Sequence, residues 1–172
     1  MKKIILDCDP GHDDAVAIML AAANEKIEIL GITCVGGNAT LHNTKNNALK
    51  ICTLIGKTHI PIYAGADRPI KFDLVTAAHV HGKSGLDIDN TTLEIENDYI
   101  IKDLHAVDFI IQTCLEESEP IYICPTGPLT NIALALQKEP AIKKNIKKII
   151  FMGGAGMSLG NITPSAEFNV YV

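Results

Sequence analysis

Four aspartates lie within eight residues near the start of the chain, in the stretch LDCDPGHDDA. They are Asp7, Asp9, Asp13 and Asp14, and a Pro-Gly pair separates the first two from the last two. Carboxylates this close together repel one another, so the cluster needs a partner that offsets the repulsion. Hard dications such as Ca²⁺ take several carboxylate and carbonyl oxygens at once. The cluster therefore predicts a divalent cation, with Asp9 at a strand end facing Asp13 and Asp14 across the turn.

Helix capping is the alternative role for part of this cluster. An acid in the first turn of a helix can cap the backbone and suits the helix dipole. Capping would account for Asp13 or Asp14 singly, but not for all four aspartates together. Asp7 precedes the turn, and we expect it to make a structural hydrogen bond.

Short apolar runs alternate with helix-like stretches along the chain, and they would form the scaffold that positions the acids. This alternation predicts βαβ units, and hence an α/β fold with an open, mostly parallel, Rossmann-like sheet flanked by helices. No repeat or linker divides the sequence, so we expect residues 1–172 to form one domain. The expected strands are 2–9, 27–37, 59–65, 120–125 and 146–152, and the expected helices are 13–24, 41–56, 105–118 and 129–140, with another short one opened by Pro140. The pattern breaks down over 66–102, which is typical of a long functional loop or an insertion.

The residues that follow the predicted strands share a chemical character. In open α/β sheets, ligands bind beyond the carboxyl ends of the strands. Acids, amides and glycines dominate these ends, and lysine and arginine are absent from them, which disfavours a phosphate or dinucleotide site. The pattern favours a site for a cation and hydroxyl groups. The residues are 9–14, 36–38, 125–128 and 152–156, followed by Asn161, Glu167 and Asn169.

Composition excludes several classes of partner. Apolar residues make up 47% of the 172 residues, which is typical of a packed globular protein. The 15 basic and 20 acidic residues give a net charge of -5, which argues against nucleic acid or an anionic membrane as the main partner. No apolar run is long enough to span a bilayer, and Asp7 comes too early for a signal peptide, so we expect a cytoplasmic protein. The five cysteines form no C-x-x-C pair, which favours buried, reduced thiols.

Six motifs, read in order, resemble the nucleoside hydrolases, specifically the group that prefers inosine and uridine or pyrimidine ribonucleosides. They are DCDPGHDDA, VGGNATLHNT, HGKSGLD, PTGPLTNIA, IIFMGGA and GNITPSAEFN. The resemblance implies a Ca²⁺-dependent enzyme that hydrolyses the N-glycosidic bond of nucleosides such as inosine, uridine and cytidine. Its products would be ribose and the free base, and a Ca²⁺-bound water would attack the sugar.

The resemblance also implies roles for individual residues. Asp9 and Asp14 resemble the Ca²⁺ ligands, with the backbone carbonyl of Thr126 as a third. Asp9 resembles the general base as well, and Asp13 the residue that grips the ribose 2′-hydroxyl. The other substrate-binding residues that the resemblance implies are Asn38, His81, Met152, Asn161, Glu167 and Asn169.

The resemblance implies a longer protein as well. Its members are expected to have about 300 residues, at the large end of ordinary domains, and to form dimers or tetramers that act on small-molecule nucleosides. We therefore expect the chain to be the N-terminal part of such a fold, truncated at the C-terminus. The part beyond Val172 would bring a further metal-ligating aspartate and a histidine that protonates the leaving base. An inactive truncated fragment is the alternative.

Three rival hypotheses fit the motifs less well. A phosphatase of the haloacid dehalogenase type would place threonine or valine where Gly11 stands. A dinucleotide fingerprint at 153–160 would need its last glycine one position earlier. The pair His79 and His81 could bind zinc from a strand, but no cysteine or third histidine lies near it in the sequence.

Overall fold

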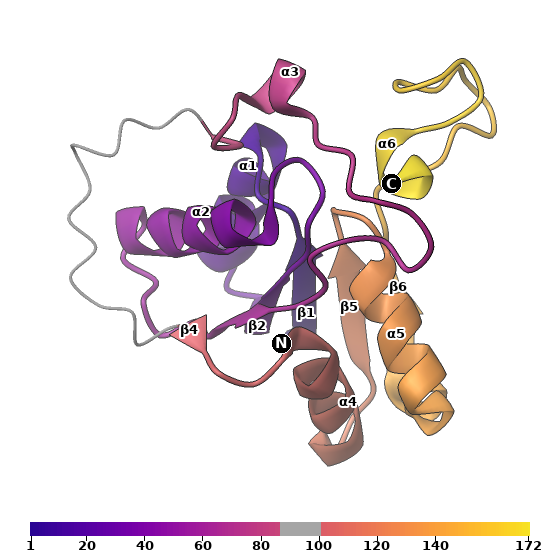
Figure 1. The fold of residues 1–172 in the computed structure, drawn as a ribbon. Helices are drawn as coiled ribbons and strands as arrows, with labels where there is room; N and C mark the ends of the chain where they lie inside the picture. Colours follow the sequence, from indigo (N-terminus) through magenta and orange to yellow (C-terminus); the bar gives the residue numbers. More distant parts are fainter. Residues whose placement is uncertain (87–100) are drawn as a thin grey trace.

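A parallel β-sheet forms the centre of the computed structural model, which describes residues 1–86 and 101–172 (Figure 1). Among these residues the sheet has six strands in the order β4-β3-β2-β1-β5-β6, and every neighbouring pair is parallel. The predicted open, parallel α/β sheet is therefore confirmed. The strands are β1 (Lys2–Cys8), β2 (Ile27–Cys34), β3 (Ile62–Ala64), β4 (Ile101–Lys102), β5 (Ile121–Pro125) and β6 (Ile146–Ile149).

Helices cover both faces of this sheet, because the central strand β1 is apolar on both sides. Ile4 and Leu6 pack with one pair of helices, α1 (His12–Ala23) and α2 (Leu41–Leu54). Ile5 points the other way and packs with α4 (Ala106–Glu116) and α5 (Thr130–Lys138). This alternation follows from the two-residue period of a strand. The helices are α1 (His12–Ala23), α2 (Leu41–Leu54), α3 (Ala78–His81), α4 (Ala106–Glu116), α5 (Thr130–Lys138), the 3₁₀ helix η2 (Pro140–Asn145) and α6 (Phe168–Tyr171). No helix in the described part of the chain is long and apolar enough to cross a membrane.

Most of the predicted elements are shorter in the structure, and three elements were not expected. The strand predicted at 59–65 is reduced to β3, and the one predicted at 146–152 ends with β6. Helix α3 and strand β4 lie inside the stretch 66–102 that we expected to be a loop, while residues 87–100 of that stretch lie outside the described residues. Helix α6 was also not predicted. These three elements have two to four residues each, too few for a periodic pattern to show.

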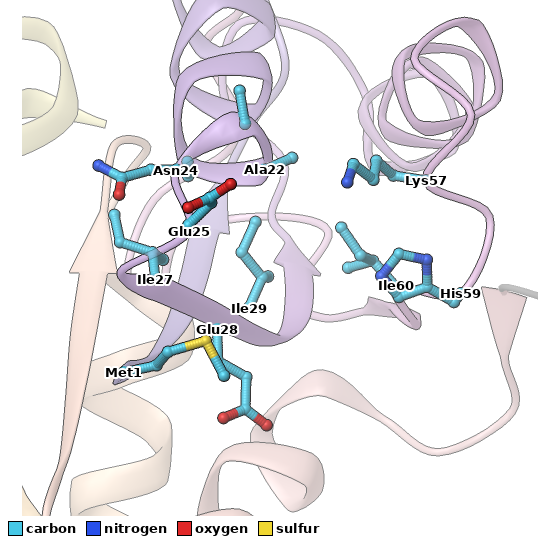
Figure 2. A pocket seen from close by; sticks show the side chains of 12 residues that line it. Met1, Ala22, Asn24, Glu25, Ile27, Glu28, Ile29, Lys57, His59 and Ile60 are labelled. Atoms are coloured by element: carbon cyan, nitrogen blue, oxygen red, sulfur yellow. The ribbon is translucent and has the colours of Figure 1, made fainter.

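An open hollow of about 510 Å³ lies at the amino ends of β1 and β2 (Figure 2). Its wall combines the apolar side chains of Ile27, Ile29 and Ile60 with polar groups such as Glu25 and Lys57. In folds of this kind ligands bind at the opposite, carboxyl end of the strands. None of the residues that the sequence analysis assigned to a site lines this hollow.

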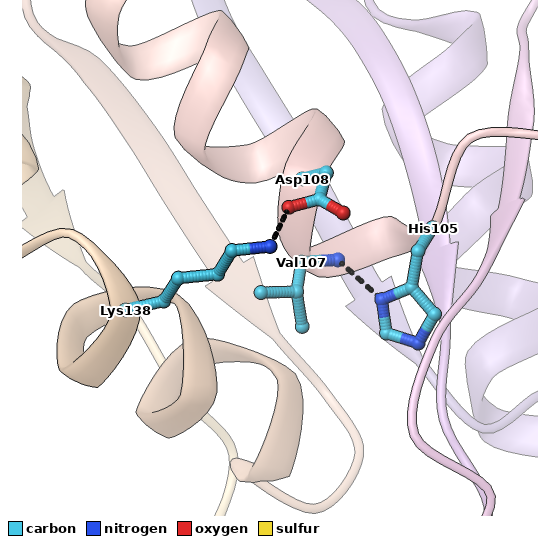
Figure 3. Close-up of polar contacts among 4 residues, drawn as sticks. All are labelled: His105, Val107, Asp108 and Lys138. Atoms are coloured by element: carbon cyan, nitrogen blue, oxygen red, sulfur yellow. Dashed lines mark hydrogen bonds and ion pairs between the residues drawn. The ribbon is translucent and has the colours of Figure 1, made fainter.

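Two polar contacts lie at the start of α4, one within its own first turn and one to α5 (Figure 3). The His105 ring accepts a hydrogen bond from the Val107 N–H at 3.2 Å, which caps the start of α4. Asp108 of α4 pairs with Lys138 of α5. Both partners of this pair are exposed, so we expect it to stabilise the fold little and the buried core beneath to matter more.

All five cysteines are free thiols, as the sequence analysis expected. Four of them are buried, and Cys124 is partly buried. Burial raises the pKa of Cys52 to about 12, so its thiol stays protonated. These side chains therefore act as small core residues.

The 172-residue chain is expected to self-associate in solution. Strand β6 lies at an edge of the described sheet, and Ile150, Phe151 and Met152, which follow it, are each about half exposed. An unpaired strand edge beside exposed apolar side chains is a docking surface for another chain. Light scattering coupled to size exclusion should therefore show a mass that rises with protein concentration.

A charge placed in this exposed segment should reduce the association. Phe151→Lys should shift the chain toward a monomer, whereas Leu54→Lys, at an exposed position on α2, should not. A concentration-independent monomer for the unmodified chain would contradict the prediction.

Candidate active site

The turn that follows β1 brings the first two acids of the site together. Pro10 and Gly11 reverse the chain between Asp9 and the start of α1. Asp14 lies in the first turn of α1, where one carboxylate oxygen accepts the Gly11 N–H at 3.2 Å and the other accepts the Thr126 hydroxyl at 2.5 Å. Asp14 thus caps the helix, the alternative role that we considered for Asp13 or Asp14. It also connects α1 to the end of β5.

Asp9 is fully buried, and only one of its two carboxylate oxygens has a hydrogen-bond partner. Its Oδ2 accepts the Asn38 N–H at 2.6 Å, whereas Oδ1 has no hydrogen-bond partner. Gly37 and Gly127 lie directly against this carboxylate, and a Cβ at either position would overlap it. A buried carboxylate oxygen without a partner is costly, so it calls for a ligand that the protein atoms do not supply.

The two carboxyl groups influence each other's charge. Burial raises the pKa of Asp9 well above its usual range, and the charge of Asp14 adds to the effect. Burial also raises the pKa of Asp14 to about 6, against the opposing hydrogen bond from Thr126. Two buried acids that resist ionisation together form a site where a cation would be favourable, because it would stabilise both charged forms.

Asp7 has the structural role that its place in the sequence predicts. Its Oδ1 accepts hydrogen bonds from the Thr33 hydroxyl at 2.5 Å and from the Asn131 amide at 2.8 Å. Burial raises the pKa of this carboxyl to about 7, although these two bonds oppose the shift. Asp7 therefore joins β1 to β2 and α5 beneath the site.

All seven residues that we expected to bind substrate line one cavity of about 250 Å³, together with Thr126. The seven are Asp13, Asn38, His81, Met152, Asn161, Glu167 and Asn169. Asp9 and Asp14 lie directly behind this lining, since they bond to Asn38 and Thr126. Within the described residues the lining contains no lysine or arginine. The cavity therefore combines acids and amides, as the ends of the strands predicted.

Helix α6 completes the cavity from a distant part of the chain, at the same end of the sheet as α3 (Figure 1). Glu167 caps α6 by accepting the Asn169 N–H at 3.0 Å, and its other oxygen accepts the Gly154 N–H at 3.2 Å. The Asn169 amide donates to the carbonyl of Thr126 at 2.8 Å. A carbonyl oxygen has two lone pairs, and Asn169 uses only one of them. The Thr126 carbonyl oxygen can therefore still bind a cation.

The donor set fits a hard dication better than a soft one. Its oxygens would come from the carboxylates of Asp9 and Asp14 and from the carbonyl of Thr126, which are ligands of the type that Ca²⁺ takes. The described residues contain no group of three His, Cys, Asp or Glu side chains suited to a metal. A cation at this position would therefore depend on carbonyl oxygens as well as on the two carboxylates. Oδ2 of Asp7 and Oδ1 of Asp9 are both buried without a hydrogen-bond partner. Asp9 is the one that bonds to the cavity-lining Asn38, so its unpartnered Oδ1 is the observation that favours a cation at the cavity.

Two rival sites are not formed. His79 and His81 lie on helix α3 rather than on a strand, and among the described residues no third His, Cys, Asp or Glu side chain joins them in a group that could hold a metal. The glycine-rich stretch at 153–160 leads into turns and an isolated bridge between Thr163 and Ala166, without the helix that a dinucleotide fingerprint requires.

Several cavity residues were not predicted from the sequence. Ala77, His79, Val80, Ile162 and Phe168 also line it, and His12 contacts His81 at its border. His12 lies inside the acidic motif, where its position could have indicated a role. The others lie in segments whose fold depends on distant contacts, so the sequence alone carries no signal for them.

Calcium is expected to stabilise the chain more at about pH 7.5 than at about pH 5. The pKa of Asp14 is raised from 3.8 to about 6 in the folded chain, so folding favours the protonated carboxyl. The stability gained in this way is complete below about pH 4 and is lost as the pH rises through 6. Protons and the cation compete for the same carboxylate oxygens. Above about pH 6 the protons are lost, so Ca²⁺ binds without this competition. At a Ca²⁺ concentration of about 100 times Kd the gain should reach about 2.7 kcal/mol.

Thermal unfolding with Ca²⁺ and with a chelator, at both pH values, measures this effect. Asp14→Asn should remove the Ca²⁺ dependence, whereas Glu25→Gln, an exposed acid at the other end of the sheet, should retain it. An equal Ca²⁺ effect in Asp14→Asn and in the unmodified chain would show that the ion binds elsewhere.

A family model described as inosine-uridine preferring nucleoside hydrolase matches residues 4–172. Over 173 residues the chain is 46% identical to the pyrimidine-specific ribonucleoside hydrolase RihB of Escherichia coli O1:K1, which covers 99% of this chain and 53% of the relative. It is 49% identical over 174 residues to an uncharacterized protein of Schizosaccharomyces pombe, with 99% of this chain and 54% of the relative covered.

Similar solved structures are also nucleoside hydrolases. The chain superposes on a purine-preferring ribonucleoside hydrolase from Gardnerella vaginalis with a TM-score of 0.87 and 36% identity, over 98% of this chain and 54% of the other. A plant nucleoside hydrolase gives a TM-score of 0.90 and 35% identity, over 99% of this chain and 53% of the other. The chain thus spans about half the length of the relatives that it matches.

Proposed function

The chain belongs to the inosine-uridine preferring nucleoside hydrolase family, and we propose that its protein hydrolyses the N-glycosidic bond of ribonucleosides to ribose and free base, with Ca²⁺ at the Asp9–Asp14 pair. The observation that carries the proposal is the buried, unpartnered Oδ1 of Asp9 behind a cavity of acids and amides. Membership of this family does not favour the haloacid dehalogenase alternative. We propose further that residues 1–172 form a single domain.

The proposed mechanism begins with Asp9. Its Oδ1 accepts the proton of the attacking water, while the Asn38 N–H holds its Oδ2 in place at 2.6 Å. The residues that would hold the ion are Asp9, Asp14 and the carbonyl of Thr126. When bound there, the ion would supply a Lewis-acid charge beside the ribose hydroxyls and would lower the pKa of the attacking water.

The cavity residues would hold the ribose in a reactive orientation. Asp13 is exposed at the cavity and accepts a hydrogen bond from a ribose hydroxyl. Glu167, Asn161 and Asn169 surround the sugar, and the half-exposed Met152 offers it an apolar surface. Holding the sugar beside the water in this way lowers the barrier through proximity and orientation. The transition state at the sugar resembles an oxocarbenium ion, and nearby carboxylates would stabilise its positive charge.

The test is the release of base and sugar by the complete protein. Incubation with inosine, uridine and cytidine in phosphate-free buffer with Ca²⁺ should produce free base and reducing ribose in equal amounts. A chelator should stop the reaction and added Ca²⁺ should restore it. Release that requires phosphate would indicate phosphorolysis instead, and the absence of any release with Ca²⁺ present would contradict the proposal.

A further inference from the structure

Two histidines that are 69 residues apart in the chain meet at the border of the cavity. The Nδ1 atoms of His12 and His81 lie 3.2 Å apart, and the two rings are stacked with their centroids 5.5 Å apart and an angle of 24° between their planes. His12 opens α1 and His81 closes α3. The proposed mechanism gives His12 no role.

The backbone is built to allow this contact. A Cβ at position 11 would overlap the His81 ring and crowd the Asn38 amide, so only glycine leaves the ring room to approach. The turn before α3 is tied to the site as well, because the Ala77 N–H donates to the Asn38 carbonyl at 3.1 Å. Asn38 therefore connects the turn before α3 to Asp9, whose carboxylate accepts the Asn38 N–H.

The hydrogen bond between the two rings restricts where their protons lie. A bond between two ring nitrogens holds one proton, so one Nδ1 donates and the other accepts. The accepting ring is neutral, and its own proton is on Nε2. Whichever ring accepts is thus held in a single tautomer.

The charge of the cavity decides which ring accepts. Because its Nδ1 bonds to His12, His81 has only Nε2 left for a molecule in the cavity. Asp13 and Glu167 line the cavity, and no lysine or arginine does so among the described residues. An N–H is favourable beside carboxylates, whereas a lone pair is not. The exposed His12 can satisfy its own Nε2 with water.

We propose that His12 is a positioning residue that donates from its Nδ1 to His81 and thereby holds His81 as the Nε2–H tautomer, a hydrogen-bond donor for an acceptor atom of the departing base. This assignment rests on the proposed function for the identity of the ligand. The tautomer itself depends on the two rings and on the carboxylates that line the cavity, all of which belong to the 172-residue chain, so it can be measured there.

Long-range ¹H–¹⁵N spectra of the chain with ¹⁵N-labelled histidine report each ring's protonated nitrogen. The expected result is a proton on Nε2 of His81 and on Nδ1 of His12, assigned with a His81→Gln variant. His12→Phe keeps a stacked ring without a donor and should leave His81 as a mixture of tautomers. His12→Asn retains a donor and should restore the Nε2–H form. A proton on Nδ1 of His81, or a tautomer that does not respond to His12→Phe, would overturn the assignment.

Kinetics of the complete protein provide the second readout. His12→Phe should lower kcat with little change in KM, by about 10–100-fold if the loss matches that seen when a partner that orients a metal-ligating histidine is removed. His12→Asn should recover most of the loss, and His59→Phe, at an exposed position beside the other hollow, should have no effect. Unchanged kcat in His12→Phe would also contradict the proposal. If the complete protein hydrolyses no ribonucleoside, the proposed function fails, but the spectra still decide the tautomer of His81.

Discussion

Asp9→Asn is expected to abolish nucleoside hydrolysis in the complete protein while leaving the fold intact. Losing a general base alone typically lowers the rate by about 10²–10⁴-fold, and this substitution also removes a charged ligand of the proposed cation. Asparagine has the same shape, so its side-chain oxygen can still accept the Asn38 N–H that now bonds to Asp9. The measurement is the rate of ribose release from inosine and uridine.

The matched control for Asp9→Asn is Glu25→Gln, which makes the same chemical change on an exposed side chain far from the cavity. Thermal unfolding in chelator should show that Asp9→Asn folds, because it removes a carboxylate whose charge the interior disfavours. Near-normal turnover in Asp9→Asn would show that another group accepts the proton.

The 172-residue chain by itself is expected to have little or no hydrolase activity. It spans about half the length of its relatives, and the family resemblance places the acid for the leaving base outside this half. Protonation of the leaving group matters most for purine nucleosides and least for activated substrates. A p-nitrophenyl riboside, whose leaving group needs no proton, should therefore be cleaved slowly if the Asp9–Asp14 pair binds its cation.

Asp9→Asn in the same short chain provides the control, since it should remove the residual cleavage of the p-nitrophenyl riboside. Inosine and uridine should show no turnover above background. Turnover of about 1–10³ s⁻¹, the range of ordinary enzymes, from a clean monomer would show that this half is sufficient.

The sheet and the acidic end of β1 could be predicted because their signals are local. Apolar runs alternate with helical ones along the chain, and Asp9, Asp13 and Asp14 lie close together in the sequence. The rule that ligands bind at the carboxyl ends of the strands then placed Asn38, Thr126 and Met152 in one region, and all of them line the cavity.

The parts that could not be predicted depend on contacts between distant residues. Helix α6 has only four residues, and the Asn169 amide anchors it to a carbonyl 43 positions earlier in the chain. The pairing of His12 with His81 spans 69 positions. The unpartnered oxygen of Asp9 is also invisible in the sequence, because it depends on how closely Gly37 and Gly127 pack around the carboxylate.

The measurement that tests the central claim most directly is a crystal structure of the protein grown with Ca²⁺, with anomalous data that identify the ion. We predict an ion bound by Asp9, Asp14 and the carbonyl of Thr126, with metal–oxygen distances of about 2.3–2.6 Å. The Oδ1 of Asp9 should then have its missing partner. A lysine or arginine side chain in this position, or a calcium ion bound only elsewhere, would contradict the account.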